Sequence, residues 1–120
     1  MYKVITYKDC AGNDAIKDYL YELAQKQNTK DARIKLNKIM EYIKQLETYG
    51  VAAGKPAIEH ITGTDLWELR PLRDRIFFAY WKYNTFILLH HFVKKTQKTP
   101  PQEIKQAERN LKDFIERYGV

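Results

Sequence analysis

The first half of the chain carries two apolar stripes at the i, i+3, i+4, i+7 spacing of one helix face. The first stripe begins at Ile16 and the second at Leu36, and the short segment 26–28 lies between them. Asn13 is placed to cap the first helix and Thr29 to cap the second. The pattern therefore predicts two consecutive helices, packed as an antiparallel hairpin.

After a stretch rich in glycine and proline, residues 50–56, the apolar period changes to two, which is typical of strands. Tyr83-Asn84 is a two-residue turn signal between two of these strands. A last helix opens at Pro100 or Pro101 and ends at Gly119. With an N-terminal β-branched and aromatic segment, the pattern predicts strands over 2–7, 66–70, 75–82 and 85–93.

This order of strand, helix, helix, three strands and helix predicts a single α+β domain over residues 1–120. We expect a small antiparallel sheet packed against the N-terminal helical hairpin, with a C-terminal helix. The segment 85–93 is apolar on both faces, so it is expected in the centre of the sheet. The second face of the sheet is expected to be partly open and available for a site.

The composition narrows the class of protein. A chain that is 44% hydrophobic and 120 residues long can bury a core and is globular rather than disordered. Its one cysteine, Cys10, excludes an intramolecular disulfide and suits a reducing compartment. No signal peptide or membrane-length apolar run is apparent. We therefore expect a cytoplasmic location.

The net charge is concentrated in one segment of the chain. Residues 69–99 contain seven basic residues and one acid, which accounts for the whole net charge of +6. The rest of the chain is neutral, with 14 basic and 14 acidic residues. A concentrated positive charge indicates an anionic partner, whereas an even spread would serve only solubility.

The predicted strand pairing brings the separate basic residues of this segment together. Arg70, Arg73 and Arg75 surround the turn between two strands, and Lys94 and Lys95 follow the strand that pairs with the second of these. Antiparallel pairing places the end of one strand beside the start of its partner. Charged strand ends also keep sheet edges soluble. A converging set with almost no local acid favours an anion-binding site, because unpaired like charges repel.

Arginine and lysine suit phosphates, and aromatic side chains on the strand 75–82 can stack on bases, so RNA or single-stranded nucleic acid is the expected ligand. Beyond the five basic residues, the expected RNA contacts are Phe77, Lys82, His91 and Lys98. His90 and His91 point to opposite faces of a strand, and His91 is expected on the open one.

The sequence shows no metal-ligand spacing and no carboxylate pair for hydrolysis, since Glu68 is the only acid expected on the open face. This leaves metal-free RNA cleavage, in which the 2′-hydroxyl attacks the adjacent phosphorus. The reaction needs a base, an acid and stabilisation of a charge-rich transition state. Arginine supplies the last of these.

Two blocks of the sequence, LWELRPLRDRIFFAYW and ILLHHFVKKTQKTPPQEIKQAERNLKDF, resemble the HigB branch of the RelE/ParE toxin superfamily, in its phage-related subgroup. The likeness covers residues 58–115 most closely. It implies the RelE-like microbial RNase fold and a toxin of a type II toxin–antitoxin system. Such toxins are ribosome-dependent, metal-free mRNA endonucleases that inhibit translation.

The resemblance also implies partners and site residues. The partners are the ribosome with its mRNA and a HigA-like helix-turn-helix antitoxin, which forms a hetero-oligomer with the toxin. The catalytic positions carried over from the family motifs are Arg70, Arg73, Arg75, Lys94 and Lys95. Many relatives place an acid–base group near the C-terminus, and this chain has no clear equivalent, so its general base and acid are unassigned.

Two other functions fit the same pattern. A toxin of the ParE kind inhibits gyrase without cutting RNA, and a plain RNA-binding module holds RNA without cleaving it. The local charge of +6 over residues 69–99 favours RNA over gyrase.

Overall fold

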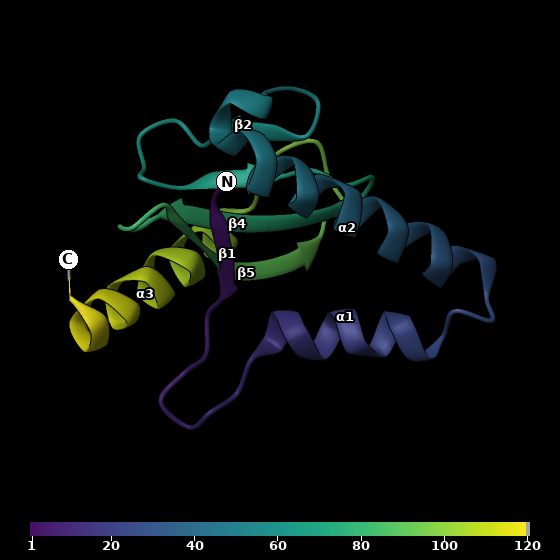
Figure 1. Cartoon of the computed structure of the whole chain (residues 1–120), viewed down its shortest axis with the longest axis horizontal. Coiled ribbons are helices and arrows are strands. Elements are labelled where there is room, and N and C mark those ends of the chain that lie inside the picture. The colour runs from purple at the N-terminus through teal and green to yellow at the C-terminus, as the bar shows by residue number, and fades with distance from the viewer. Residues whose placement is uncertain (120) are drawn as a thin grey trace.

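The structure is a computed structural model and describes residues 1–119 (Figure 1). A five-stranded sheet carries helices on both of its faces. In chain order the elements are β1 (Lys3–Thr6), α1 (Ala15–Gln25), α2 (Lys30–Tyr49), a short 3-10 helix (Gly50–Ala53), β2 (Ile58–His60), β3 (Trp67–Leu69), β4 (Asp74–Tyr80), β5 (Thr85–Val93) and α3 (Pro101–Tyr118).

The strand order in space is β1-β5-β4-β3-β2, so β4 is the central strand and β5 lies beside it. β4 and β5 pair antiparallel across the predicted turn. Tyr83 and Asn84 both have positive φ, at 56° and 55°, and the amide of Thr85 donates to the carbonyl of Lys82 at 3.2 Å. These features match the type I′ turn that joins tight hairpins.

The sheet is mixed, and the prediction of a purely antiparallel sheet was wrong. β1 pairs parallel with β5, with Lys3 opposite Thr85 and Thr6 opposite Leu88. The two helices of the hairpin separate β1 from the later strands, and such a long connection allows parallel pairing. Period-two patterning shows which residues form a strand but does not show its direction relative to a distant neighbour.

Strand β2 was missed by the sequence pattern. It spans three residues and pairs antiparallel with β3 at the edge of the sheet, with Glu59 opposite Glu68. Three residues are too few to show an alternating pattern. This strand matters for the site because it places Glu59 next to Arg70, with which it forms an ion pair.

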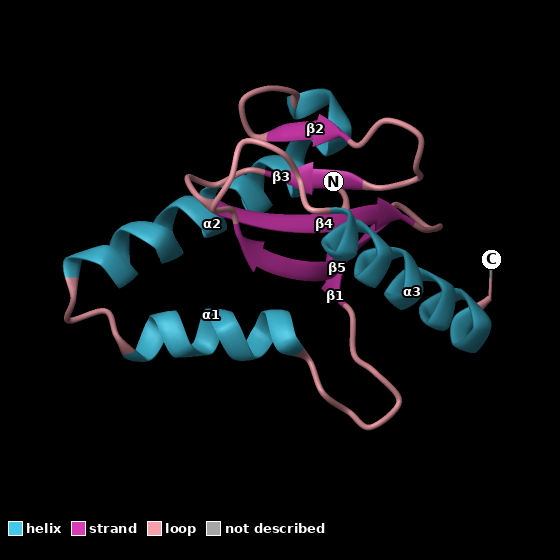
Figure 2. Cartoon of the chain, turned by 180° about the vertical axis from the view of Figure 1, so that it is seen from behind, coloured by secondary structure: helices cyan, strands magenta, loops and turns pink. Residues whose placement is uncertain are grey.

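The helical hairpin of α1 and α2 covers one face of the sheet, as predicted, and α3 covers the other (Figures 1 and 2). The second face was expected to be partly open, and α3 packs on β4 and β5 of that face. Ile39, Leu46 and Phe78 belong to the core under the hairpin. Phe77 and Phe114 belong to the core under α3.

The helix ends follow the sequence signals closely. Thr29 caps α2 as predicted, and Gly119 follows the last residue of α3. Asp14, rather than Asn13, caps α1, and its side chain accepts from the amide of Lys17 at 3.0 Å. The amide of Asn13 instead donates to Asp9 in the preceding loop. Among residues 1–119, no helix is long and apolar enough to span a bilayer.

Candidate functional site

A basic pocket of about 390 Å³ lies at the end of the sheet where β4 begins and β5 ends. All five residues predicted as catalytic line it. Its full lining is Arg70, Leu72, Arg73, Arg75, Lys94, Lys95, Thr96 and Gln97. Antiparallel pairing of β4 with β5 makes the two basic groups converge, as the sequence predicted.

The turn before β4 contains Leu72 in a strained backbone conformation, and hydrogen bonds from Arg75 stabilise it. Leu72 has a φ of 58°, a conformation that non-glycine residues rarely adopt. The amide of Asp74 donates to the carbonyl of Pro71 at 3.1 Å. The Arg75 guanidinium donates to the carbonyls of Leu72 at 2.7 Å and Asp74 at 2.8 Å. Arg75 therefore fixes the turn as well as lining the pocket.

The rim of the pocket continues the β4–β5 ladder by one further backbone contact. The amide of Lys94 donates to the carbonyl of Arg73 at 2.8 Å, and both side chains line the pocket. Arg73 and Lys95 are exposed, whereas Arg75 is only 9% exposed. Burial, and then the neighbouring Arg70, lower the pKa of Arg75. The pocket therefore combines exposed basic side chains at its rim with the nearly buried guanidinium of Arg75.

Arg70 is held between two carboxylates. It forms an ion pair with Glu59 of β2, and its Nε lies 3.2 Å from Oε1 of Glu68 of β3. Burial raises the pKa of Glu68, and the opposing effects of Arg70, Arg75 and Lys94 do not cancel it. The sequence pattern indicates a role for neither glutamate, because Glu59 lies in the missed strand and the contact of Glu68 with Arg70 depends on the fold.

The other four cations of the pocket have no acidic partner. Within residues 1–119, no ion pair involves Arg73, Arg75, Lys94 or Lys95. Like charges held together without counter-charges favour the binding of an anion. The free positive charge is therefore that of these four residues, with Arg70 already neutralised.

A buried polar cluster lies directly behind the turn. Asp74 is fully buried and accepts from the Tyr19 hydroxyl at 2.7 Å and from Nε2 of His91 at 2.9 Å. Nζ of Lys35 lies 3.8 Å from the same carboxylate oxygen. Burial alone would raise the pKa of Asp74, but the hydrogen bonds from His91 and Tyr19 and the charge of Lys35 lower it overall. The cluster ties α1, α2 and β5 to the start of β4.

Two of the predicted RNA contacts pack against the helices instead of facing an open surface. His91 packs beneath the hairpin and stacks on Tyr19 at 3.9 Å between ring centroids, so the prediction that it lies on an open face was wrong. Phe77 is fully buried beneath α3 and is not available to stack on a base. The apolar stripe of α3 predicted a helix, but it did not show which face of the sheet this helix covers.

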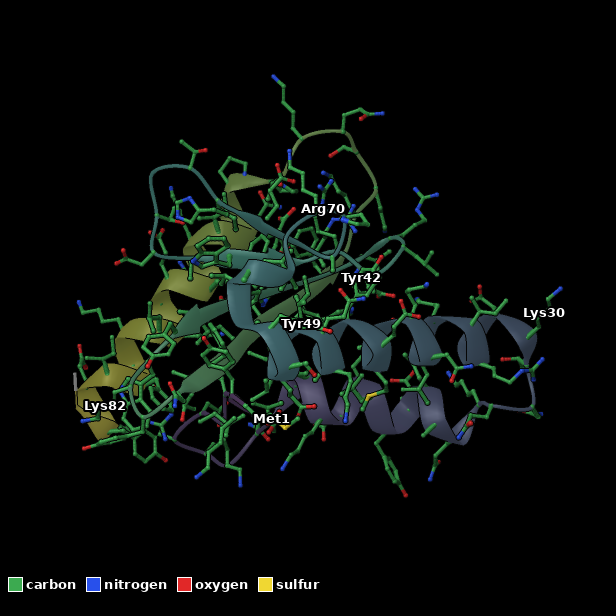
Figure 3. All side chains as sticks on the ribbon, turned by 45° about the horizontal axis from the view of Figure 1, so that its top comes forward. Met1, Lys30, Tyr42, Tyr49, Arg70 and Lys82 are labelled. Atoms are coloured by element: carbon green, nitrogen blue, oxygen red, sulfur yellow. The ribbon has the colours of Figure 1, made fainter. Side chains whose placement is uncertain are left out.

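Lys82 and Lys98 lie apart from the pocket lining. Lys82 follows β4, at the opposite end of that strand from the pocket, and Figure 3 shows it far from Arg70. Its ammonium packs 5.0 Å from the ring centroid of Trp81 and 5.4 Å from that of Tyr83. Lys98 is exposed on the loop that carries Lys95, and its carbonyl accepts from Thr96.

The histidines are engaged by carboxylates on opposite sides of β5. His91 contacts Asp74, while Nε2 of His90 lies 2.7 Å from Glu103 of α3. They therefore point to opposite faces, as predicted. Over residues 1–119, no group of three or more His, Cys, Asp or Glu side chains is arranged to hold a metal ion.

A mixed sheet with helices on both faces and a cationic pocket at one end defines an α+β protein with a site suited to an anion. The family model named Phage derived protein Gp49-like (DUF891) matches residues 28–112, and the chain belongs to this family. The family is associated with the toxins of toxin–antitoxin systems, which implies an antitoxin partner. A search among curated proteins returned no match.

Proposed function

We propose that the whole chain forms one toxin domain of the HigB type, with the RelE-like fold, that cuts mRNA on the ribosome. The observation that carries this proposal is the basic pocket, in which Arg73, Arg75, Lys94 and Lys95 converge without acidic partners. Membership of a family associated with toxins supports the same conclusion.

In the proposed reaction, the 2′-hydroxyl oxygen of the RNA attacks the adjacent phosphorus, and the bond from phosphorus to the 5′-oxygen breaks. Negative charge builds up on the phosphoryl oxygens in the transition state. Fixed cations aimed at this charge stabilise it more than they stabilise the ground state. Arg75 is held by two backbone carbonyls, so it is already oriented before RNA binds.

The proposed partners follow from this activity. A HigA-like helix-turn-helix antitoxin would form a hetero-oligomer with the chain and silence it, and the ribosome would present the mRNA. The proposed site of action is the cytoplasm, where translation takes place. The chemistry requires no metal, because the nucleophile belongs to the RNA itself.

A reconstituted translation reaction tests the proposal. The purified chain should stop synthesis of a reporter and cut its mRNA within the translated region. Arg73→Ala and Lys95→Ala should each lower cleavage roughly ten-fold or more, because each removes a charge-assisted contact to phosphate. Both side chains are exposed at the rim, so the fold is preserved.

Lys82→Ala is the matched control, since it removes the same kind of charge at the opposite end of β4 and should leave cleavage intact. Intact mRNA together with inhibited gyrase in a supercoiling assay would favour the ParE kind of toxin. Tight binding of RNA without any cut on programmed ribosomes would favour an RNA-binding module.

A further inference from the structure

The proposed cleavage needs a group that accepts the proton of the attacking hydroxyl. No carboxylate, imidazole or phenol lines the basic pocket, whose titratable residues are arginines and lysines. His90 and His91 already contact Glu103 and Asp74. A carboxylate that acts as the acceptor must therefore lie just behind the lining residues.

Glu68 occupies that position. It is the central residue of β3 and lies opposite Phe77 of β4, so its side chain shares a sheet face with Phe77 and Arg75. Its carboxylate lies 3.2 Å from Nε of Arg70, which lines the pocket. Glu68 is 6% exposed and is not part of the lining, so it lies behind Arg70 rather than at the rim.

Two arginines that line the pocket, and Glu68 behind them, have polar atoms that form no hydrogen bond within the protein. Within residues 1–119, Glu68 takes part in no side-chain hydrogen bond, and its contact with Arg70 is an ion pair only. Nε of Arg70 and Nε of Arg75 are buried donors without a hydrogen-bond partner, and Oδ2 of Asp74 is a buried acceptor without one. Such groups are costly to bury, and most buried polar groups are paired.

A ribose with its 3′-phosphate matches this set of unsatisfied groups. Phosphate oxygens accept hydrogen bonds, which Nε of Arg70 and Nε of Arg75 can donate. The 2′-hydroxyl donates one, which the carboxylate of Glu68 can accept. The reacting part of an RNA chain would therefore supply acceptors for the two arginine Nε groups and a donor for the Glu68 carboxylate.

We propose that Glu68 is the general base of the cleavage and accepts the proton of the attacking 2′-hydroxyl. This inference rests on the proposed function. The proton moves to a Glu68 carboxylate oxygen as the bond from the 2′-oxygen to phosphorus forms. The bond from phosphorus to the 5′-oxygen breaks, and the leaving oxygen takes a proton from water. The products are a 2′,3′-cyclic phosphate and a 5′-hydroxyl, after which Glu68 returns its proton to solvent.

The environment of Glu68 suits this role. Burial raises the pKa of its carboxyl group above the ordinary value, and a carboxylate with a raised pKa is a stronger base. A base must be deprotonated to act, so the rate should fall as the pH drops through the pKa of Glu68. This acid limb should lie above the ordinary glutamate pKa of about 4.3.

The test is single-turnover cleavage by the purified chain on programmed ribosomes, measured from acidic to neutral pH. Glu68→Gln should lower the rate roughly 10²–10⁴-fold and remove the acid limb, while half-saturation with ribosomes changes little. Glu59→Gln is the matched control, because it removes the other carboxylate from Arg70. It should lose far less rate and keep the acid limb.

Equal losses in Glu68→Gln and Glu59→Gln with the acid limb retained would overturn the inference and make Glu68 a positioning residue for Arg70. Urea unfolding checks the fold of each variant. If Glu68→Gln does not fold, Glu68→Asp should retain the acid limb at a reduced rate, and its loss there would count against the inference. A wild-type chain that leaves the mRNA intact, or cuts a 2′-deoxy substrate equally well, overturns the proposed function instead.

Discussion

At the scale of single residues, Asp74, between Arg73 and Arg75, is a fully buried carboxylate. Its hydrogen bonds reach α1 through Tyr19 and β5 through His91. A buried charge is stable only when hydrogen bonds and opposite charges compensate it. The side chains behind the pocket therefore determine how firmly the basic turn is held.

Tyr19→Phe should lower the free energy of unfolding by about 1–3 kcal/mol, because it removes one donor from a fully buried carboxylate and keeps the stacked ring. Tyr21→Phe is the matched control. Tyr21 is 66% exposed, and its loss of a hydroxyl should change stability by less than about 0.5 kcal/mol. Urea unfolding at neutral pH measures both, and equal values would show that the Tyr19 hydroxyl does not support Asp74.

At the same scale, the sequence predicted the converging cations but not the two carboxylates that pair with Arg70. Arg73, Arg75, Lys94 and Lys95 follow one antiparallel pairing, and a period-two pattern with a turn signal is enough to infer it. Glu68 lies one residue outside the basic segment, and Glu59 reaches Arg70 only through a three-residue strand. Contacts of this kind depend on side-chain directions in the folded sheet, which charge counting does not give.

At the scale of elements, local signals predicted each element better than its place in the fold. β5 begins and ends at the predicted residues, 85–93, and Thr29 caps α2 as expected. The parallel pairing of β1 and the face covered by α3 were not predicted. Both depend on long-range packing between elements, and the amphipathic or apolar pattern of one element does not specify its partner.

The hairpin turn between β4 and β5 gives a test at this scale. Asn84 has a φ of 55°, where a β-branched residue is strongly disfavoured. Asn84→Val should lower the free energy of unfolding by about 1–2 kcal/mol, whereas Asn84→Gly should stay within about 0.5 kcal/mol of the wild type or exceed it. The substitutions leave the backbone hydrogen bonds of Asn84 in place, so urea unfolding compares how well each variant tolerates the left-handed conformation. Equal stability of the two variants would contradict a left-handed turn.

At the scale of the whole molecule, the fold divides the basic segment into two parts. Its seven basic residues all fall within residues 69–99, yet Lys82 lies at the opposite end of β4 from the pocket. Arg70 is neutralised by Glu59 and Glu68. The charge that an RNA chain would meet in the pocket is therefore smaller than the sequence total, and it lies at one end of the sheet.

The salt dependence of RNA binding measures this free charge. Four cations without acidic partners, each neutralising one phosphate, predict a slope of about −3 in a plot of log binding constant against log salt concentration. Lys95→Ala should reduce the size of this slope by about 0.7, because it removes one phosphate contact. Lys82→Ala should leave it unchanged if the RNA lies in the pocket. Fluorescence anisotropy with a labelled single-stranded RNA gives all three slopes.

A slope that responds to Lys82 and not to Lys95 would place the RNA on another surface, because both variants change the net charge of the chain equally.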